Sequence, residues 1–262
     1  MLKNRRWRFI DTGVGSAEWN MAVDEVLLKN HKESDFPTLR FYGWNKALSA
    51  GRFSKIEQSV DLEKLEKNKI ACVRRLSGGG ILVHDNDLSY SLIFAHNFLK
   101  DKSVKESYFY LCSFLINLYK KFGLNAEFAC KIGLQSGHSN ICLAGREPYD
   151  IIIDGKKMGG NAQRYTRSTM FQHGSIPISL NETLFESLFL QESGLKDAAT
   201  LQKLGVFAAY KMLSKTAVET FCETYEAEIE IDTLSASEKQ SAKELMQNKY
   251  TQKRWNIYAK SS

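Results

Sequence analysis

The feature of this sequence that most constrains the fold is the separation of strand patterns from helix patterns. Extended apolar or alternating runs lie between about residues 38 and 180, at 38–44, 48–52, 70–75, 81–85, 87–95, 149–165 and 170–179. Apolar residues at helical spacing occupy 16–30, 60–68 and 107–123, and the pattern after residue 181 is helical. Strands in one stretch with helices before, between and after them predict an α+β fold around a mixed sheet.

Two local signals refine this expectation. The dipeptide Asp154-Gly155 joins two extended runs and predicts a tight β-hairpin. Residues 107–123 are apolar nearly all round, which favours a central buried helix that ends at Gly123. The chain has 262 residues, only three prolines and no Gly/Ser-rich linker. We therefore expect a single domain over 1–262, with a helical C-terminal segment from about residue 182.

Composition narrows the function classes. The net charge of +6 is mild for this length and is spread along the chain, which predicts an acidic protein partner rather than nucleic acid. No apolar run reaches the roughly 18 residues of a membrane-spanning helix, and the N-terminus lacks the apolar core of a signal peptide, so no membrane partner is expected. The five cysteines form no CxxC pair, which argues against a zinc site or a disulfide framework. We expect no metal ligands and a cytoplasmic location.

The stretch VRRLSGGGILVHD, residues 73–85, is the first candidate site. Its three glycines fit neither a P-loop nor a dinucleotide-binding loop, because a strand pattern and not a helix follows them. Gly78–Gly80 could serve only as a strand connection that needs positive φ. Alternatively, the loop could approach a ligand closely, with Arg74 and Arg75 holding a carboxylate or phosphate and His84 following at short range.

The second stretch, residues 140–163, combines a cysteine with a lysine. Cys142 lies in a loop pattern before the hairpin, whereas Cys72, Cys112 and Cys222 have the apolar surroundings of buried structural cysteines. Lys157 follows the hairpin turn, and alternation places it on the face opposite to Lys156. Further along, His173 lies in a strand pattern, where a packed core histidine is the commoner interpretation than a catalytic one.

These residues resemble a known family. RRLSGGGILVHD with IDGKKMGGNAQRYTRSTMFQHGSIPI is similar to the catalytic domain shared by lipoate–protein ligases, octanoyltransferases and, more distantly, biotin protein ligases. NMAVDEVLL, LRFYGW and KYTQKRWNIY extend the resemblance over nearly the whole chain. It implies an α+β fold with a large mixed β-sheet flanked by helices, an acyl pocket under the glycine loop, and acyl transfer to a lysine of a lipoyl-accepting protein.

Within that family, the chain most resembles the cysteine-dependent monomeric octanoyltransferases. The resemblance implies that Cys142 forms an octanoyl thioester and that Lys157 assists catalysis. The substrate-binding residues that it implies are Arg74, Arg75, Ser77, Gly78, Gly79, Gly80, His84, Gly160, Asn161, Ala162 and His173. The implied donor is acyl carrier protein, and the implied acceptor is a lipoyl domain or a protein like the H protein of glycine cleavage.

Two alternatives stay open at this point. An ATP-dependent lipoate–protein ligase would need ATP and Mg²⁺, whereas the transferase needs no cofactor because thioester-to-thiol exchange is nearly isoenergetic. The third glycine, Gly80, is the more ligase-like feature, and Cys142 is the more transferase-like one. A binding protein that retains the acyl pocket is the non-enzymatic alternative. His84 and His173 are candidates, by residue type alone, for the base that deprotonates the acceptor lysine.

Overall fold

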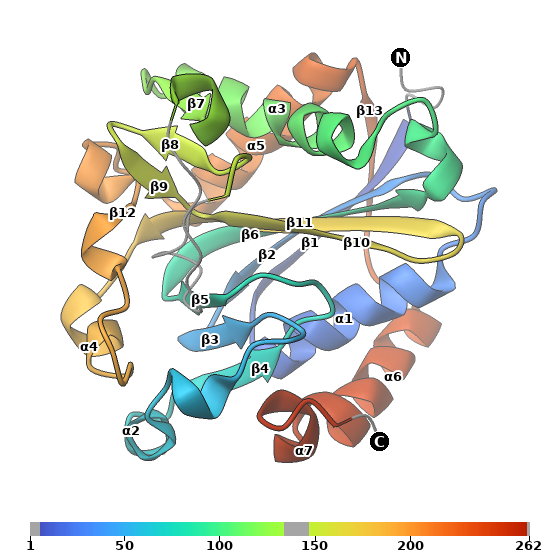
Figure 1. The fold of residues 1–262 in the computed structure, drawn as a ribbon. Helices are drawn as coiled ribbons and strands as arrows, with labels where there is room; N and C mark the ends of the chain where they lie inside the picture. The colour runs from blue at the N-terminus through green and yellow to red at the C-terminus, as the bar shows by residue number, and fades with distance from the viewer. Residues whose placement is uncertain (1–5, 134–146, 261–262) are drawn as a thin grey trace.

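The computed structural model describes residues 6–133 and 147–260 (Figure 1). The strands are β1 (Arg6–Gly15), β2 (Thr38–Trp44), β3 (Ala47–Ala50), β4 (Ala71–Arg74), β5 (Ile81–His84), β6 (Asn86–Ala95), β7 (Ala126–Phe128), β8 (Ile151–Ile153), β9 (Lys156–Met158), β10 (Gly160–Tyr165), β11 (Thr169–Ser179), β12 (Ala198–Ala199) and β13 (Glu228–Asp232). The α-helices are α1 (Ala17–Asn30), α2 (Leu62–Lys67), α3 (Val104–Lys121), α4 (Glu182–Glu186), α5 (Tyr210–Tyr225), α6 (Ala236–Leu245) and α7 (Lys253–Asn256). The shorter helical turns are η1 (Ile56–Gln58), η2 (His96–Leu99), η3 (Ala129–Ile132), η4 (Leu195–Asp197), η5 (Gln202–Leu204) and η6 (Met246–Tyr250).

The largest sheet has the strand order β10-β11-β6-β2-β1-β13. Strand β1 runs parallel to both β2 and β13, and the other neighbours are antiparallel, so the sheet is mixed as the sequence predicts. Two small sheets, β4-β3-β5 and β12-β9-β8-β7, complete the strands of the described residues. The predicted α+β class with a large mixed sheet and flanking helices is confirmed.

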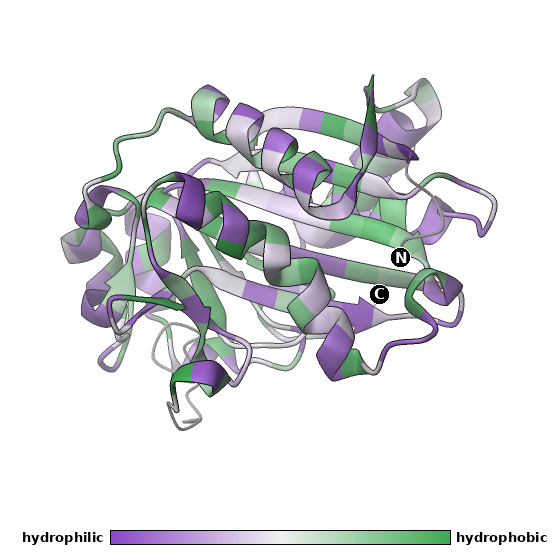
Figure 2. Ribbon diagram, turned by 90° about the horizontal axis from the view of Figure 1, so that it is seen from above, coloured by the Kyte–Doolittle hydropathy of each residue, from purple (hydrophilic) through white to green (hydrophobic). Residues whose placement is uncertain are grey.

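Helices cover both faces of the large sheet (Figure 1). Leu92 and Phe94 of β6 share one hydrophobic core with α3 and α5, whereas Ile93 between them belongs to a second core with α1 and α6. This is the two-residue period of a strand that is buried on both sides. Figure 2 shows α3 and α5 over the sheet with hydrophilic and hydrophobic residues interleaved along each helix, as amphipathic covering helices require.

Local chemistry at the element ends agrees with the sequence. The Ser16 side chain accepts a hydrogen bond from the Trp19 backbone N–H and caps α1. Asp154 and Gly155 both have positive φ, +50° and +75°, which gives the tight turn between β8 and β9. Gly123, with φ of +76°, follows the C-terminal end of α3.

Two fold predictions need correction. Helix α3 is not central: its Leu111, Phe114 and Leu118 are buried against the sheet, while Asn117, Lys120 and Lys121 are exposed. The region after residue 182 is not purely helical, because β12 pairs with β9 and β13 pairs with β1. Strand β13 has the sequence EIEID and lies at the sheet edge, with Ile231 83% exposed. Strand β1, which precedes residue 38, was also absent from the prediction. Among the described residues, the helices are too short or too polar to cross a membrane.

Candidate active site

The glycine loop connects β4 to β5 and is held against the end of β3. The Gly51 N–H donates to the Gly80 carbonyl at 3.1 Å, and the Arg52 N–H donates to the Ser77 carbonyl at 2.8 Å. Gly79 has φ of +91°, and a Cβ at Gly51 would lie 1.9 Å from the Gly79 oxygen. The loop is therefore a strand connection that needs positive φ, and its glycines also permit close approach of two backbone segments.

The two arginines beside the loop bind backbone carbonyls. Arg74 is buried, and its guanidinium donates to six carbonyls: those of Gly51, Arg52, Ser54, Trp255, Asn256 and Ile257. Arg75 donates to the Ser49 carbonyl and hydroxyl and to the carbonyls of Gly78 and Gly80. Arg74 thus has a structural role, tying the C-terminal segment to the loop. For Arg74 the expected phosphate or carboxylate role does not fit these bonds, whereas for Arg75 that role stays a prediction.

A cavity of about 30 Å³ lies between the glycine loop and the large sheet. Its lining brings together seven of the residues predicted from the sequence: Arg75, Gly79, His84, Gly160, Asn161, Ala162 and His173. Tyr42, Trp44, Ser49, Leu82, Ser89, Gly174 and Ser175 also line it. This volume suits about one water molecule, whereas pockets for organic ligands usually exceed roughly 300 Å³. An acyl chain can enter only if the lining residues move apart.

His84 is fixed in this cavity by contacts on three sides. Its Nδ1 lies 2.9 Å from Asp87 Oδ2, and its Nε2 lies 2.7 Å from Ser49 Oγ. The Trp44 ring stacks on the imidazole at 3.8 Å between centroids. Asp87 Oδ2 also accepts hydrogen bonds from the Ser89 and Ser175 hydroxyls. This carboxylate can stabilise an imidazolium at His84, as the acid does in catalytic triads.

His173 has a different environment. Its Nε2 lies 2.5 Å from Ser77 Oγ, and its ring packs against Phe171 at 4.8 Å between centroids. Burial lowers the pKa of His173 well below its usual value, and the charges of Arg75 and His84 act in the same direction. His173 is therefore neutral at pH 7. It is a packed histidine, as the commoner interpretation of the sequence has it, and it also borders the cavity.

Asn161 of β10 is held by hydrogen bonds from β6 and α3. The Tyr90 hydroxyl donates to its side-chain oxygen at 2.8 Å, and the Tyr108 hydroxyl donates to its carbonyl at 2.6 Å. Gly174 on β11 makes room for this side chain, because a Cβ there would lie 2.1 Å from the Asn161 oxygen. Gln172 in turn donates to the Tyr90 hydroxyl at 2.8 Å. Polar side chains on three strands thus fix one wall of the cavity.

Lys157 lies on the inner face of the β8–β9 hairpin. Only 4% of the residue is exposed, whereas Lys156 is exposed, so the predicted alternation is confirmed. Its Nζ forms an ion pair with Asp150 Oδ2 at 2.7 Å, and Asp150 is itself buried. Burial raises the pKa of Asp150, and the Lys157 ammonium opposes that rise. Lys157 lies outside the cavity lining described above.

The sequence interpretation missed the acidic partners of both candidate residues. Asp85, the acid that follows His84 in the sequence, approaches Lys46 at 3.7 Å, whereas Asp87 pairs with the histidine. The partner of Lys157 was predictable. A two-residue turn at 154–155 places Ile152 opposite Lys157, so Asp150 falls on the same face at the diagonal position. Asp87 and Ser175 lie on β6 and β11, which are far apart in the sequence but adjacent in the sheet. Their contact therefore cannot be predicted without the strand order.

Cys142, the predicted nucleophile, lies outside the described residues. Of the other cysteines, Cys72 and Cys112 have pKa values raised to about 12 by burial, which fits the prediction that they act as small hydrophobic side chains. The described residues contain no cluster of three or more His, Cys, Asp or Glu side chains that could hold a metal ion. The expectation that no metal is bound stays a prediction.

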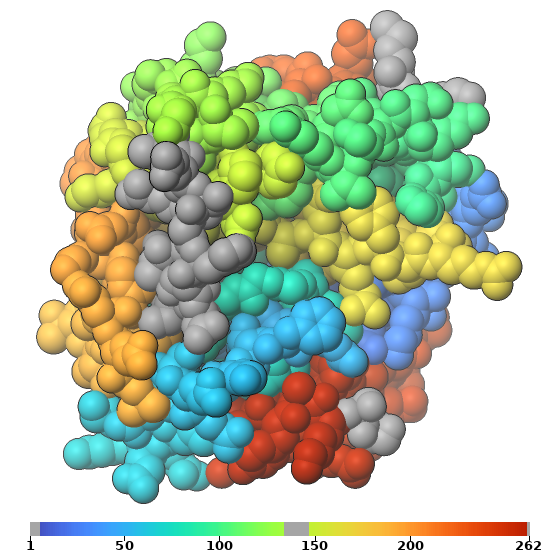
Figure 3. Space-filling view, in the orientation of Figure 1, coloured from blue at the N-terminus to red at the C-terminus, as the bar shows by residue number. Residues whose placement is uncertain are grey.

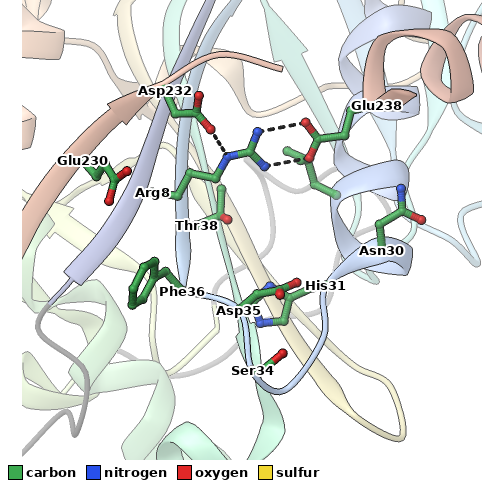
Figure 4. Close-up of a pocket in the computed structure, with 11 residues that line it drawn as sticks. Arg8, Asn30, His31, Ser34, Asp35, Phe36, Thr38, Glu230, Asp232 and Glu238 are labelled. Carbon is green, nitrogen blue, oxygen red and sulfur yellow. Dashed lines mark hydrogen bonds and ion pairs between the residues drawn. The ribbon is translucent and has the colours of Figure 1, made fainter. Parts of the chain in front are cut away.

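A larger cavity, of about 390 Å³, lies away from these residues, between α1, β13 and α6 (Figure 4). Arg8 lines this cavity, and its guanidinium donates hydrogen bonds to two carboxylates: Asp232 at 2.6 Å and Glu238 at 2.6 and 2.8 Å. A hydrogen bond from the Thr233 backbone, together with one from Arg8, lowers the pKa of Asp232, and the hydrogen bond from Arg8 lowers the pKa of Glu238. The cation is thus neutralised within the fold, and none of the predicted site residues lines this cavity.

Comparison with known proteins places this arrangement in a family. Residues 16–228 match the family described as the lipoyl protein ligase A/B catalytic domain. The chain belongs to this family. Octanoyltransferase LipM of Geobacillus kaustophilus is 34% identical over 96% of this chain and 98% of that protein. The protein of the same name from Oceanobacillus iheyensis is 32% identical over 94% and 95%, and that from Bacillus subtilis is 35% identical over 73% and 72%.

Solved structures of family members share the fold. Lipoate-protein ligase A, solved with bound ATP, superposes with a TM-score of 0.81 at 24% identity and covers 98% of this chain and 100% of its own. A bipartite lipoate protein ligase of Thermoplasma acidophilum, studied with its E2 lipoyl domain, gives a TM-score of 0.80 at 22% identity, with coverage of 99% and 98%. At these identities the structures support the fold alone.

Proposed function

We propose that this protein is an octanoyltransferase that acts in protein lipoylation. The observation that carries the proposal is its similarity, over nearly the whole chain, to several relatives named octanoyltransferase. The buried Lys157 on the hairpin and the cavity under the glycine loop provide two parts that such chemistry needs. We further propose acyl carrier protein as the donor, a lipoyl domain or an H-like protein as the acceptor, and no cofactor.

The first half-reaction forms a thioester on the protein. The Cys142 thiolate attacks the thioester carbonyl of the donor, a new C–S bond forms, and the bond to the carrier sulfur breaks. The carrier thiolate leaves and takes up a proton. An ammonium group such as that of Lys157 favours the thiolate and stabilises the oxyanion of the tetrahedral intermediate. Asp150 holds this ammonium group on the inner face of the hairpin.

The second half-reaction moves the acyl group to the acceptor. The acceptor lysine loses a proton and attacks the acyl carbonyl, so that an amide C–N bond forms and the Cys142 sulfur leaves. His84 is better suited than His173 to take that proton, because Asp87 at 2.9 Å stabilises the imidazolium. His173 is disfavoured as a base because burial lowers its pKa. We therefore assign His84 as the general base and Asp87 as its positioning residue.

One experiment separates this function from ATP-dependent ligation. The purified protein is incubated with an apo lipoyl domain and either octanoyl-acyl carrier protein alone or free octanoate with ATP and Mg²⁺. Modification of the domain with the carrier-protein donor and no ATP is the expected result. Modification only with free acid and ATP would make the protein a ligase, the function to which Gly80 of the loop is better suited.

A further inference from the structure

The structure gathers basic residues that are far apart in the sequence. We define the basic patch as Arg52, Lys55, Lys249, Arg254 and Lys260. The first two belong to the loop after β3, and the others belong to η6, α7 and the residue run beyond it. Figure 3 shows the two segments in contact on one face of the molecule, where the light-blue loop meets the red C-terminal segment.

An aromatic ring joins the two segments. The Arg52 guanidinium carbon lies 4.4 Å from the centre of the Trp255 ring, and Lys249 Nζ lies 3.9 Å from the same centre. Cations stack favourably on the face of an indole. Arg74 strengthens the junction from below, because it binds the carbonyls of both segments. These contacts fix the loop after β3 and the C-terminal segment relative to each other, so the basic patch is a defined surface.

Most of the charge on the basic patch faces solvent. Lys55, Arg254 and Lys260 are exposed, and among the described residues none of them forms an ion pair within 4.0 Å. Lys249 is the exception, since Glu25 binds it at 2.6 Å. A cavity of about 250 Å³ in the patch is lined by Lys249, Arg254, Lys260 and Trp255 with neutral polar residues, and no acid lines it. Phe53, 86% exposed, lies in the same loop as Arg52.

The basic patch borders the glycine loop. The Ser54 hydroxyl donates to the Gly79 carbonyl at 3.1 Å, and the Arg52 N–H donates to the Ser77 carbonyl at 2.8 Å. A protein bound at Arg52 and Lys55 would therefore lie at the edge of the loop that lines the cavity.

We propose that the basic patch is the docking face for the acidic carrier protein that donates the acyl thioester. This inference rests on the proposed function and adds the surface that recognises its donor. The exposed cations of the patch are complementary to an acidic protein, and the acyl arm of a carrier protein is attached through an anionic phosphodiester that these cations attract. Exposed Phe53, in the same loop as Arg52, supplies an apolar contact beside these charges, and protein interfaces combine apolar contacts with a polar rim.

A matched pair of variants tests the docking face. The patch variant carries Lys55→Glu, Arg254→Glu and Lys260→Glu, and the control variant carries Lys105→Glu, Lys211→Glu and Lys215→Glu on α3 and α5. All six positions are exposed, and each set of three reversals lowers the formal net charge by six, from +6 to zero. The rate of acyl-enzyme formation is measured with octanoyl-carrier protein and with the small neutral donor octanoyl-N-acetylcysteamine.

The expected result is specific to one donor and one variant. The second-order rate with the carrier protein falls roughly 10-fold or more in the patch variant at low salt, and much less in the control variant. Both variants keep the wild-type rate with the small donor, which also verifies that they fold. An equal fall in both variants would mean that net charge alone acts. A defect confined to transfer onto the lipoyl acceptor would mean that the patch binds the acceptor. Either result overturns the proposal.

Binding measured directly separates this inference from the proposed function. Fluorescence anisotropy of a labelled acidic carrier protein gives its dissociation constant for each variant, whether or not an acyl group moves. If wild type forms no acyl-enzyme with either donor, the proposed function fails. In that case, weaker binding by the patch variant than by the control would still support the docking face, and equal binding would overturn it.

Discussion

The buried pair of Lys157 and Asp150 gives the sharpest test of the structure around the site. We expect Asp150→Ala to destabilise the protein strongly, because it leaves the Lys157 ammonium buried without its carboxylate. The replacement of both residues, Asp150→Leu with Lys157→Met, should restore most of that stability. Two apolar side chains of similar volume remove the desolvation cost together with the attraction.

The magnitude follows from the geometry. Two unit charges 2.7 Å apart attract each other by about 6 kcal/mol at an effective dielectric constant of roughly 20. Desolvation of both groups offsets much of this gain, since the two side chains are only 4% and 6% exposed. Loss of one partner from a buried pair costs about 3–5 kcal/mol, and apolar replacement of the whole pair is often neutral. We therefore expect single and double variants to differ by about 3 kcal/mol.

The assay is urea unfolding of wild type, both single variants and the double variant, followed by circular dichroism and fluorescence. A coupling energy obtained from this cycle isolates the pair from the other contacts of each residue. Lys156→Met is the matched control, because this exposed neighbour should change the free energy of unfolding by less than about 0.5 kcal/mol. Additive costs, with the double variant as unstable as the sum of the singles, would refute the buried pair.

Three further outcomes are expected. Lys157→Ala should lower the transfer rate on the order of 100-fold or more, and Lys156→Ala should leave it unchanged; equal kinetics would remove Lys157 from the site. Asp87→Asn should slow transfer to the acceptor by about 100-fold while acyl-enzyme formation changes little, and a shared loss would argue against a His84 base. Because the pKa of His173 is lowered on folding, the unfolded chain binds its proton first as pH falls below about 6.5. The free energy of unfolding should therefore drop below that pH, and less so in His173→Gln; an identical slope would contradict this account.

The sequence predicts those parts of the fold that depend on local chemistry. The Asp154-Gly155 turn, the Ser16 cap and the positive φ at Gly123 all follow from residue types and are found in place. Strands β1 and β13 were missed for a physical reason. β13 alternates isoleucine with acids at an exposed edge, so its pattern lacks the apolar run of an inner strand, and its pairing with β1 joins residues more than 200 positions apart.

In the candidate site, too, local features are predictable from the sequence and long-range contacts are not. Strand alternation alone placed Lys157 on the face opposite to Lys156, which the structure shows to be buried, and its partner Asp150 follows from the same hairpin register. The sequence could not reveal that the Arg74 guanidinium donates to six backbone carbonyls, because the three chain segments involved, β4, 51–54 and 255–257, meet only in the folded protein. For the same reason the basic residues behind the net charge of +6 are spread along the sequence, although folding brings the five cations of the basic patch together on one face.

The proposed mechanism requires that Cys142 carry the octanoyl group as a thioester. Intact mass spectrometry detects this adduct directly. The protein is incubated with octanoyl-acyl carrier protein in the absence of acceptor, beside the Cys142→Ser variant and a Cys130→Ser control. We expect one octanoyl adduct in wild type and in the Cys130 variant, no adduct in Cys142→Ser, and loss of the adduct when an apo lipoyl domain is added. Full transfer activity in a Cys142→Ala variant, with no adduct in wild type, would contradict the proposed mechanism.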